Sequence, residues 1–134
     1  MRLQKIRIFF TTLDRDIVTL LRKATFEKIA IEGKEYYALD IDVTPFCNPK
    51  VKKEGNSRTY KRIDGFAPIM AYFCSYALCF DLRPGSQHSE NQAPEFLRRC
   101  MAMISELDIA PEDVLLRVDS GHDAAAFIKE AFMI

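Results

Sequence analysis

The sequence predicts an α/β fold in which helices flank a mixed sheet. Two short apolar segments, at residues 36–43 and 114–118, have strand-like patterns, and an amphipathic segment at residues 94–107 lies between them in the chain. A nearly continuous apolar stretch, residues 66–82, supplies further strands. With 134 residues, of which 49% are apolar, the chain has the size of one domain and enough apolar side chains for a core.

The N-terminal segment fits a helix better than a strand. Ile6, Ile8 and Phe10 alternate as in a strand, but apolar residues also recur at intervals of three and four, as on one face of a helix. Thr12 can cap a helix whose first turn would hold two acidic residues. We therefore expect a helical lead-in over residues 1–33, with the helix ending near Ile31 and Gly33.

Residues 36–43 predict a strand with two acids on one face. Successive side chains of a strand point to opposite faces, so Asp40 and Asp42 share one face while Leu39 and Ile41 share the other. The prolines and the glycine that follow predict a loop of roughly twenty residues, long enough to have a function of its own.

This loop carries a concentration of positive charge, although the whole chain has a net charge of zero. Six basic residues accompany a single acid, Glu54. They are Lys50, Lys52, Lys53, Arg58, Lys61 and Arg62. Such a stripe suits a nucleic-acid backbone, and the alternative is an ordinary solvated loop.

The second half of the chain predicts a hairpin, a helix, a strand and a last helix. Residues 66–82 would form two paired strands that turn near Ser75 and Tyr76. The pattern of residues 94–107 predicts an amphipathic helix, and that of residues 114–118 predicts a short strand buried on both faces. The last helix is expected from about Asp123 onward.

Composition excludes some classes of protein. No apolar stretch approaches the about 18 residues that cross a membrane, and the N-terminus lacks the cleavage pattern of a secretory signal. We therefore expect a cytoplasmic protein with no membrane partner. The four cysteines form no C-x-x-C pair, which favours free thiols over a zinc site or disulfides.

Acidic residues lie where the two apolar strands end. Asp42 lies at the end of the first, and Asp119 directly follows the second. Ligands of open α/β sheets bind beyond the carboxyl ends of parallel strands, and carboxylate oxygens are the ligands that Mg²⁺ and Mn²⁺ prefer. The sequence therefore predicts a divalent-metal site for phosphate chemistry.

One family with such acids is the haloacid-dehalogenase-like phosphatases, which the D-x-D-x-T motif at residues 40–44 resembles. That resemblance implies Asp40 as nucleophile, Asp42 as general acid and base, and Asp119 with Asp123 as magnesium ligands. Three departures count against it. No helix clearly follows the first strand, Val118 replaces the usual glycine before the late acid, and Lys61 is only the nearest candidate for the phosphate-neutralising lysine.

A longer series of motifs resembles the DDE transposases of bacterial insertion sequences (DDE transposase group 1) over about Tyr36 to Phe132. The matching pieces, in chain order, are LDIDVT (Leu39–Thr44), the apolar segment that opens at Pro68, LRPG (Leu82–Gly85) followed by His88 and Ser89, EFLRR (Glu95–Arg99) and LLRVDSG (Leu115–Gly121). Several ordered matches outweigh one five-residue match, so we prefer this family.

The resemblance implies a ribonuclease-H-like fold and DNA transposition, a DNA recombination reaction. In this chemistry divalent metal ions held by three carboxylates activate water and then a 3′ hydroxyl. Asp42 and Asp119 would be the first two catalytic carboxylates and ligands of Mg²⁺ or Mn²⁺, with Asp40 in a supporting place. The implied partners are the transposon ends and target DNA, and a homodimer is a further option for the full-length protein.

The third carboxylate has no evident place in this sequence. Fifteen residues follow Asp119, fewer than the helix, strand and second helix that the family pattern needs. Glu130 would lie roughly 10 Å along the last predicted helix from the site. We therefore expect residues 34–134 to be a partial catalytic domain, truncated before its last strand and helix and inactive alone. A decayed, non-catalytic DNA-binding remnant is the other alternative.

Overall fold

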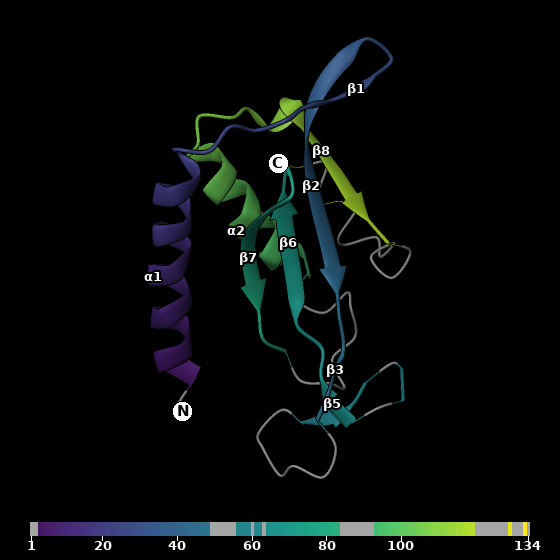
Figure 1. The fold of residues 1–134 in the computed structure, drawn as a ribbon. Coiled ribbons are helices and arrows are strands. Elements are labelled where there is room, and N and C mark those ends of the chain that lie inside the picture. Colours follow the sequence, from purple (N-terminus) through teal and green to yellow (C-terminus); the bar gives the residue numbers. More distant parts are fainter. Residues whose placement is uncertain are drawn as a thin grey trace.

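The protein has a mixed α/β fold, seen in a computed structural model that describes residues 3–48, 56–59, 61–62, 64–83, 93–119, 129 and 133. The elements follow one another as α1 (Leu3–Leu21), β1 (Ile29–Ile31), β2 (Lys34–Val43), β3 (Phe46–Cys47), β4 (Ser57–Arg58), β5 (Asp64–Phe66), β6 (Ile69–Phe73), β7 (Tyr76–Asp81), α2 (Ala93–Ser105), the 3₁₀ turn η1 (Pro111–Asp113) and β8 (Val114–Val118). Figure 1 shows α2 behind the main sheet and α1 beside β7.

Strand β2 is the centre of the main sheet. It pairs antiparallel with β6 and parallel with β8, and its first residues pair antiparallel with β1. Strand β7 continues the sheet beyond β6. Since β2 and β8 run in the same direction, their carboxyl ends meet at one edge of the sheet, the lower edge in Figure 1.

The alternation predicted for β2 is confirmed. Leu39, Ile41 and Val43 are 0, 3 and 5% exposed and belong to the hydrophobic core, whereas Asp42 on the other face is exposed. The same core contains Val18 of α1. Helix α2 contributes its buried stripe, made of Ala93, Phe96, Leu97, Cys100, Met103 and Ile104.

The N-terminal prediction of a helix is correct, but its predicted end is wrong. Helix α1 ends at Leu21 rather than near Ile31 and Gly33, and Thr12 lies inside it rather than at its start. Ile29–Ile31 instead forms a hairpin with the start of β2. Glu32 and Gly33 make the two-residue turn with φ of 50° and 80°, a conformation that glycine adopts without steric cost.

The predicted hairpin in the apolar stretch is confirmed, with its turn one residue earlier than expected. The turn residues are Cys74 and Ser75, both with positive φ, 47° and 72°. This is the backbone of a type I′ turn, which matches the twist of the flanking strands. No glycine or asparagine signals it in the sequence, so the exact position was missed.

Strand β8 occupies the predicted residues, but the prediction that both its faces are buried is wrong for the described part of the protein. Its residues are half-buried or exposed, and Val118 is 39% exposed. The predicted basic loop is also partly wrong, because β3, β4 and β5 form a small antiparallel sheet there. The last predicted helix, with Asp123, lies mostly outside the described residues. Lys129 and Met133 are described, and both are helical.

Candidate functional site

Asp42 and Asp119 occupy neighbouring positions at the carboxyl edge of the sheet. The parallel register runs from Tyr37 opposite Val114 to Ile41 opposite Val118, so the next residues on the two chains are the two aspartates. Neighbouring strands lie about 4.8 Å apart. Both aspartates are exposed. Two aspartates 77 positions apart in the sequence thus each follow the last paired residue of a parallel strand pair.

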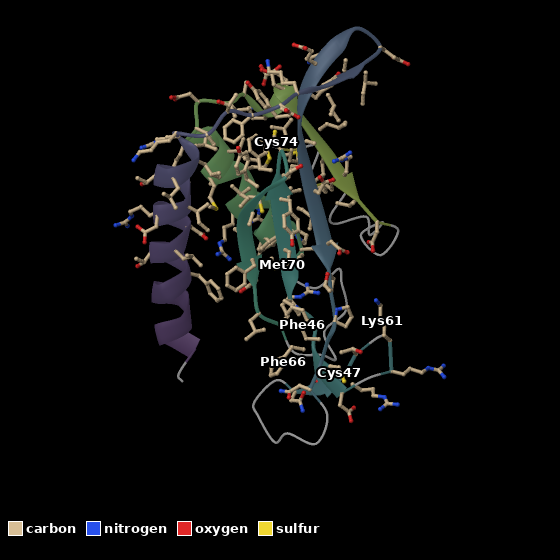
Figure 2. All side chains as sticks on the ribbon, viewed as in Figure 1. Phe46, Cys47, Lys61, Phe66, Met70 and Cys74 are labelled. Atoms are coloured by element: carbon tan, nitrogen blue, oxygen red, sulfur yellow. The ribbon has the colours of Figure 1, made fainter. Side chains whose placement is uncertain are left out.

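A hydrogen bond orients the Asp42 carboxylate. The Thr44 hydroxyl donates to Oδ2 of Asp42 over 3.1 Å, and the Thr44 backbone N–H donates to the Pro68 carbonyl over 3.1 Å. Across the antiparallel pair, Asp42 lies opposite Met70, which is labelled in the lower part of the main sheet in Figure 2. The end of β2 is therefore hydrogen-bonded to the segment before β6, and one oxygen of the Asp42 carboxylate has a partner in Thr44.

Asp40 is engaged by an arginine from β8. Nε of Arg117 donates to Oδ1 of Asp40 over 2.7 Å, and an Nη2 hydrogen of Arg117 is donated to Oδ2 over 2.8 Å. The two residues are register partners. These hydrogen bonds, and the negative charge of Asp40, raise the pKa of Arg117. Both oxygens of Asp40 therefore already have a partner.

The basic window is only partly described. Lys50, Lys52 and Lys53 lie outside the described residues. The described residues between Phe46 and Phe66, which we call the arm, extend from the end of β2 (Figure 1). Figure 2 shows Phe46 and Phe66 where the arm begins and Lys61 displaced to one side. Lys61 and Arg62 are exposed, and Arg58 pairs with Asp64 over 3.3 Å.

The arm is built on a close approach of two backbones. Phe46 pairs with Phe66, and Cys47 with Gly65. A Cβ atom on Gly65 would collide with the carbonyl oxygen of Phe46. Only glycine fits there, which is why a glycine occurs inside this short strand.

Two arginines beside the site were not among the residues selected from the sequence. Arg83 is 2% exposed and donates from Nε to the Ala67 carbonyl over 3.2 Å; burial lowers its pKa, and nearby Asp81 acts in the opposite direction. Arg117 is the other. Arg117 is the one charged residue inside the apolar strand β8, and that contrast was the available signal for it.

The described residues contain no group of three or more His, Cys, Asp or Glu side chains that could hold a metal ion. Glu130 and His88 lie outside the described part. All four cysteines are free. Neither α1 nor α2, nor any other described helix, is long and apolar enough to cross a membrane.

Comparison with known proteins places the chain in no family. No family model, no curated protein and no solved structure matches it. What is established is a mixed α/β protein with two neighbouring carboxylates at the carboxyl edge of its sheet.

Proposed function

We propose that this chain is part of a transposase catalytic domain, in which Asp42 and Asp119 hold a Mg²⁺ or Mn²⁺ ion for DNA strand cleavage and transfer. The observation that supports the proposal is the parallel pairing of β2 with β8, which ends with Ile41 opposite Val118, the residues directly before Asp42 and Asp119. The pairing joins two motifs, LDIDVT and LLRVDSG, that the resemblance to DDE transposases singles out.

The sheet is compatible with the ribonuclease-H-like fold that we propose. Strands β2, β6 and β7 form an antiparallel meander, α2 follows, and β8 returns to lie parallel to β2 on the side away from β6. A strand, a crossing helix and a parallel strand bring two carboxyl ends to the same edge, where ligands of mixed α/β sheets bind.

The donor set fits a hard divalent cation. Asp42 and Asp119 offer exposed carboxylate oxygens on neighbouring strands, and Thr44 restricts the rotation of the first. When bound, a divalent ion supplies an activated water and neutralises charge that develops on the phosphate. The role of the two aspartates is to hold that ion at the edge from which the arm extends.

The arm suits the DNA partner in this proposal. Lys61 and Arg62 are exposed on a segment that begins where β2 ends, so a phosphate backbone lying along the arm would pass near Asp42. Binding of this kind tolerates different sequences and weakens steeply as salt rises. DNA is therefore the proposed partner. The proposed phosphate-binding residues are Arg58, Lys61 and Arg62, which the structure describes, and Lys50, Lys52 and Lys53, which lie outside the described residues.

The phosphatase alternative is less compatible with the site. A nucleophilic Asp40 would need a carboxylate oxygen directed at the substrate, and both of its oxygens accept hydrogen bonds from Arg117. In addition, β2 is followed by the arm and an antiparallel strand rather than by a helix. Turnover of a phosphate monoester that is lost in Asp40→Asn would favour the phosphatase over our proposal.

The experiment that tests the proposal measures DNA binding with and without metal. A fluorescent duplex of arbitrary sequence is titrated with the chain in Mn²⁺ and in EDTA, using fluorescence anisotropy. We expect Mn²⁺ to raise the affinity several-fold for the wild type and for the control Asp16→Asn, an exposed aspartate on α1. Asp42→Asn should lose this increase. Equal affinities in Mn²⁺ and EDTA for the wild type would contradict the proposal.

A further inference from the structure

Arg117 lies on the same face of the sheet as the proposed metal ligands. Asp40 and Asp42 are two residues apart on β2, and Arg117 and Asp119 are two residues apart on β8 and its extension, so all four belong to one face by the strand period. The face thus carries an ion pair, Asp40 with Arg117, directly behind the pair of carboxylates.

The geometry of the ion pair leaves part of the guanidinium available. Arginine has five N–H donors in a planar fork. Arg117 donates its Nε–H and one Nη2–H to the Asp40 carboxylate in a side-on arrangement. Its other three N–H donors point away from that carboxylate. The side chain of Arg117 is 55% exposed, so solvent and ligands can reach it.

We infer that Arg117, held in place by Asp40, binds a phosphate group of the nucleic-acid backbone beside the carboxylate pair. The inference rests on the proposed function, because the ligand is the same DNA. Guanidinium is the side-chain group that best matches phosphate oxygens, through paired N–H donors. An arginine in this position places one phosphate within reach of a metal held by Asp42 and Asp119.

Asp40 has a definite role in this arrangement. An arginine next to two carboxylates would otherwise turn toward Asp42 or Asp119 and compete with the metal for their oxygens. Asp40 accepts hydrogen bonds from Nε and Nη2 and so keeps the guanidinium at the register position two residues before Asp42 and Asp119. The pair is also too exposed to add much to folding stability, since exposed ion pairs contribute little. Asp40 is therefore a positioning residue.

The test is the salt dependence of DNA binding, measured in EDTA so that the result does not depend on metal. The affinity of the folded chain for a fluorescent duplex is measured at several salt concentrations for wild type, Arg117→Gln, Asp40→Asn and Lys34→Gln. Lys34 is the matched control, because its loss changes the charge equally and it lies six residues before Asp40, about 20 Å along the strand. Circular dichroism and a thermal melt check that each variant is folded.

Arg117→Gln should lower the affinity about tenfold at low salt and reduce the slope of log affinity against log salt by about 0.7 to 0.9, the loss of one phosphate contact. Asp40→Asn keeps the cation but frees it to turn toward Asp42 or Asp119, so the affinity and the slope should also fall, by less than in Arg117→Gln. Lys34→Gln should leave the slope unchanged. Loss of a negative charge that lowers DNA affinity is the result that identifies Asp40 as a positioning residue, since charge alone would raise the affinity.

A purely structural ion pair gives a different pattern. Arg117→Gln and Asp40→Asn would then lower the thermal midpoint equally, and neither would change the slope, which would overturn the inference. If Arg117→Gln does not fold, Arg117→Lys replaces it: the retained charge should keep the slope while the affinity falls, and wild-type affinity would overturn the inference. Failure of Mn²⁺ binding at Asp42 and Asp119 would overturn the proposed function without altering these metal-free results.

Discussion

Ile41 on β2 and Val118 on β8 are partners in a parallel register. This relationship determines the candidate site, because the residue after each of them is an aspartate. A shift of one residue in this register would move the β8 side chains to the opposite face relative to β2. Asp40 and Arg117 are register partners one step before, and their bidentate contact occurs in this same register.

The contact between the two helices should be important for stability. Arg99 on α2 donates to both carboxylate oxygens of Asp14 on α1, over 2.5 and 2.8 Å, and the side chains are only 25 and 16% exposed. Asp14→Asn should lower the free energy of unfolding by about 1–3 kcal/mol, since it leaves a partly buried cation without its charged partner. Urea unfolding measures this. The exposed Asp16→Asn should change stability by less than about 0.5 kcal/mol, and an equal effect of the two would refute the prediction.

The β6–β7 turn holds a residue in a conformation that suits glycine. Ser75 is exposed and has φ of 72°, where an L side chain costs about 1–2 kcal/mol. Ser75→Gly should raise the free energy of unfolding by about 0.5–1 kcal/mol, after allowance for the greater freedom of glycine in the unfolded chain. Ala102→Gly on the exposed side of α2 should lower it by about 1 kcal/mol. Thermal melts that show the same sign for both would be inconsistent with the turn conformation.

The arm can be disrupted without touching its charges. In Gly65→Ala the new methyl group would collide with the Phe46 carbonyl, so β3 and β5 should separate. The Asn48 amide, which donates to the Asp64 carbonyl over 2.7 Å, should then exchange faster with solvent in hydrogen-exchange NMR. DNA affinity should fall several-fold. Gly33→Ala is the control, because it strains the β1–β2 turn and should leave both measurements unchanged.

Alkaline pH should destabilise the protein through its buried thiols. Burial raises the pKa of Cys100 well above its ordinary value of 9.0, and burial also raises that of Cys74. A raised pKa in the folded state means that the thiol's contribution to stability is complete below the unfolded pKa and is lost as pH rises through the folded one. The free energy of unfolding should therefore fall above about pH 9, and less so in Cys100→Ala. Urea unfolding between pH 7 and 10.5 tests this, and parallel curves for the two proteins would contradict it.

Much of the main sheet could be predicted from sequence because its signals are local. The period of two in β2 and the apolar stripe of α2 follow directly from which side chains are buried. The sequence does not predict the end of α1 correctly, because the apolar residues at Ile29–Ile31 are compatible with a continued helix. Only their pairing with Lys34–Tyr36 identifies them as a strand. The β6–β7 turn was misplaced by one residue because Cys74 and Ser75 carry no turn signal.

The neighbourhood of Asp42 and Asp119 followed from the rule that parallel strands end at one edge of a sheet. The partner of Asp40 could not be predicted, because a contact with Arg117 depends on the exact register of residues 77 positions apart. The sequence predicts a loop for the arm because strands of two or three residues are too short to show a periodic pattern. Gly65 is typical of loops, but in the structure it allows a close contact between two backbones.

The most direct test of the central claim is Mn²⁺ binding by the chain alone, followed by electron paramagnetic resonance of the free ion. The account predicts saturable binding by wild type and by Asp16→Asn, with affinity reduced at least about tenfold in Asp42→Asn and in Asp119→Asn, because each removes one charged ligand. The double variant should bind Mn²⁺ no more tightly than the nonspecific background. Wild-type Mn²⁺ affinity in Asp119→Asn would contradict the claim that these two aspartates form one metal site.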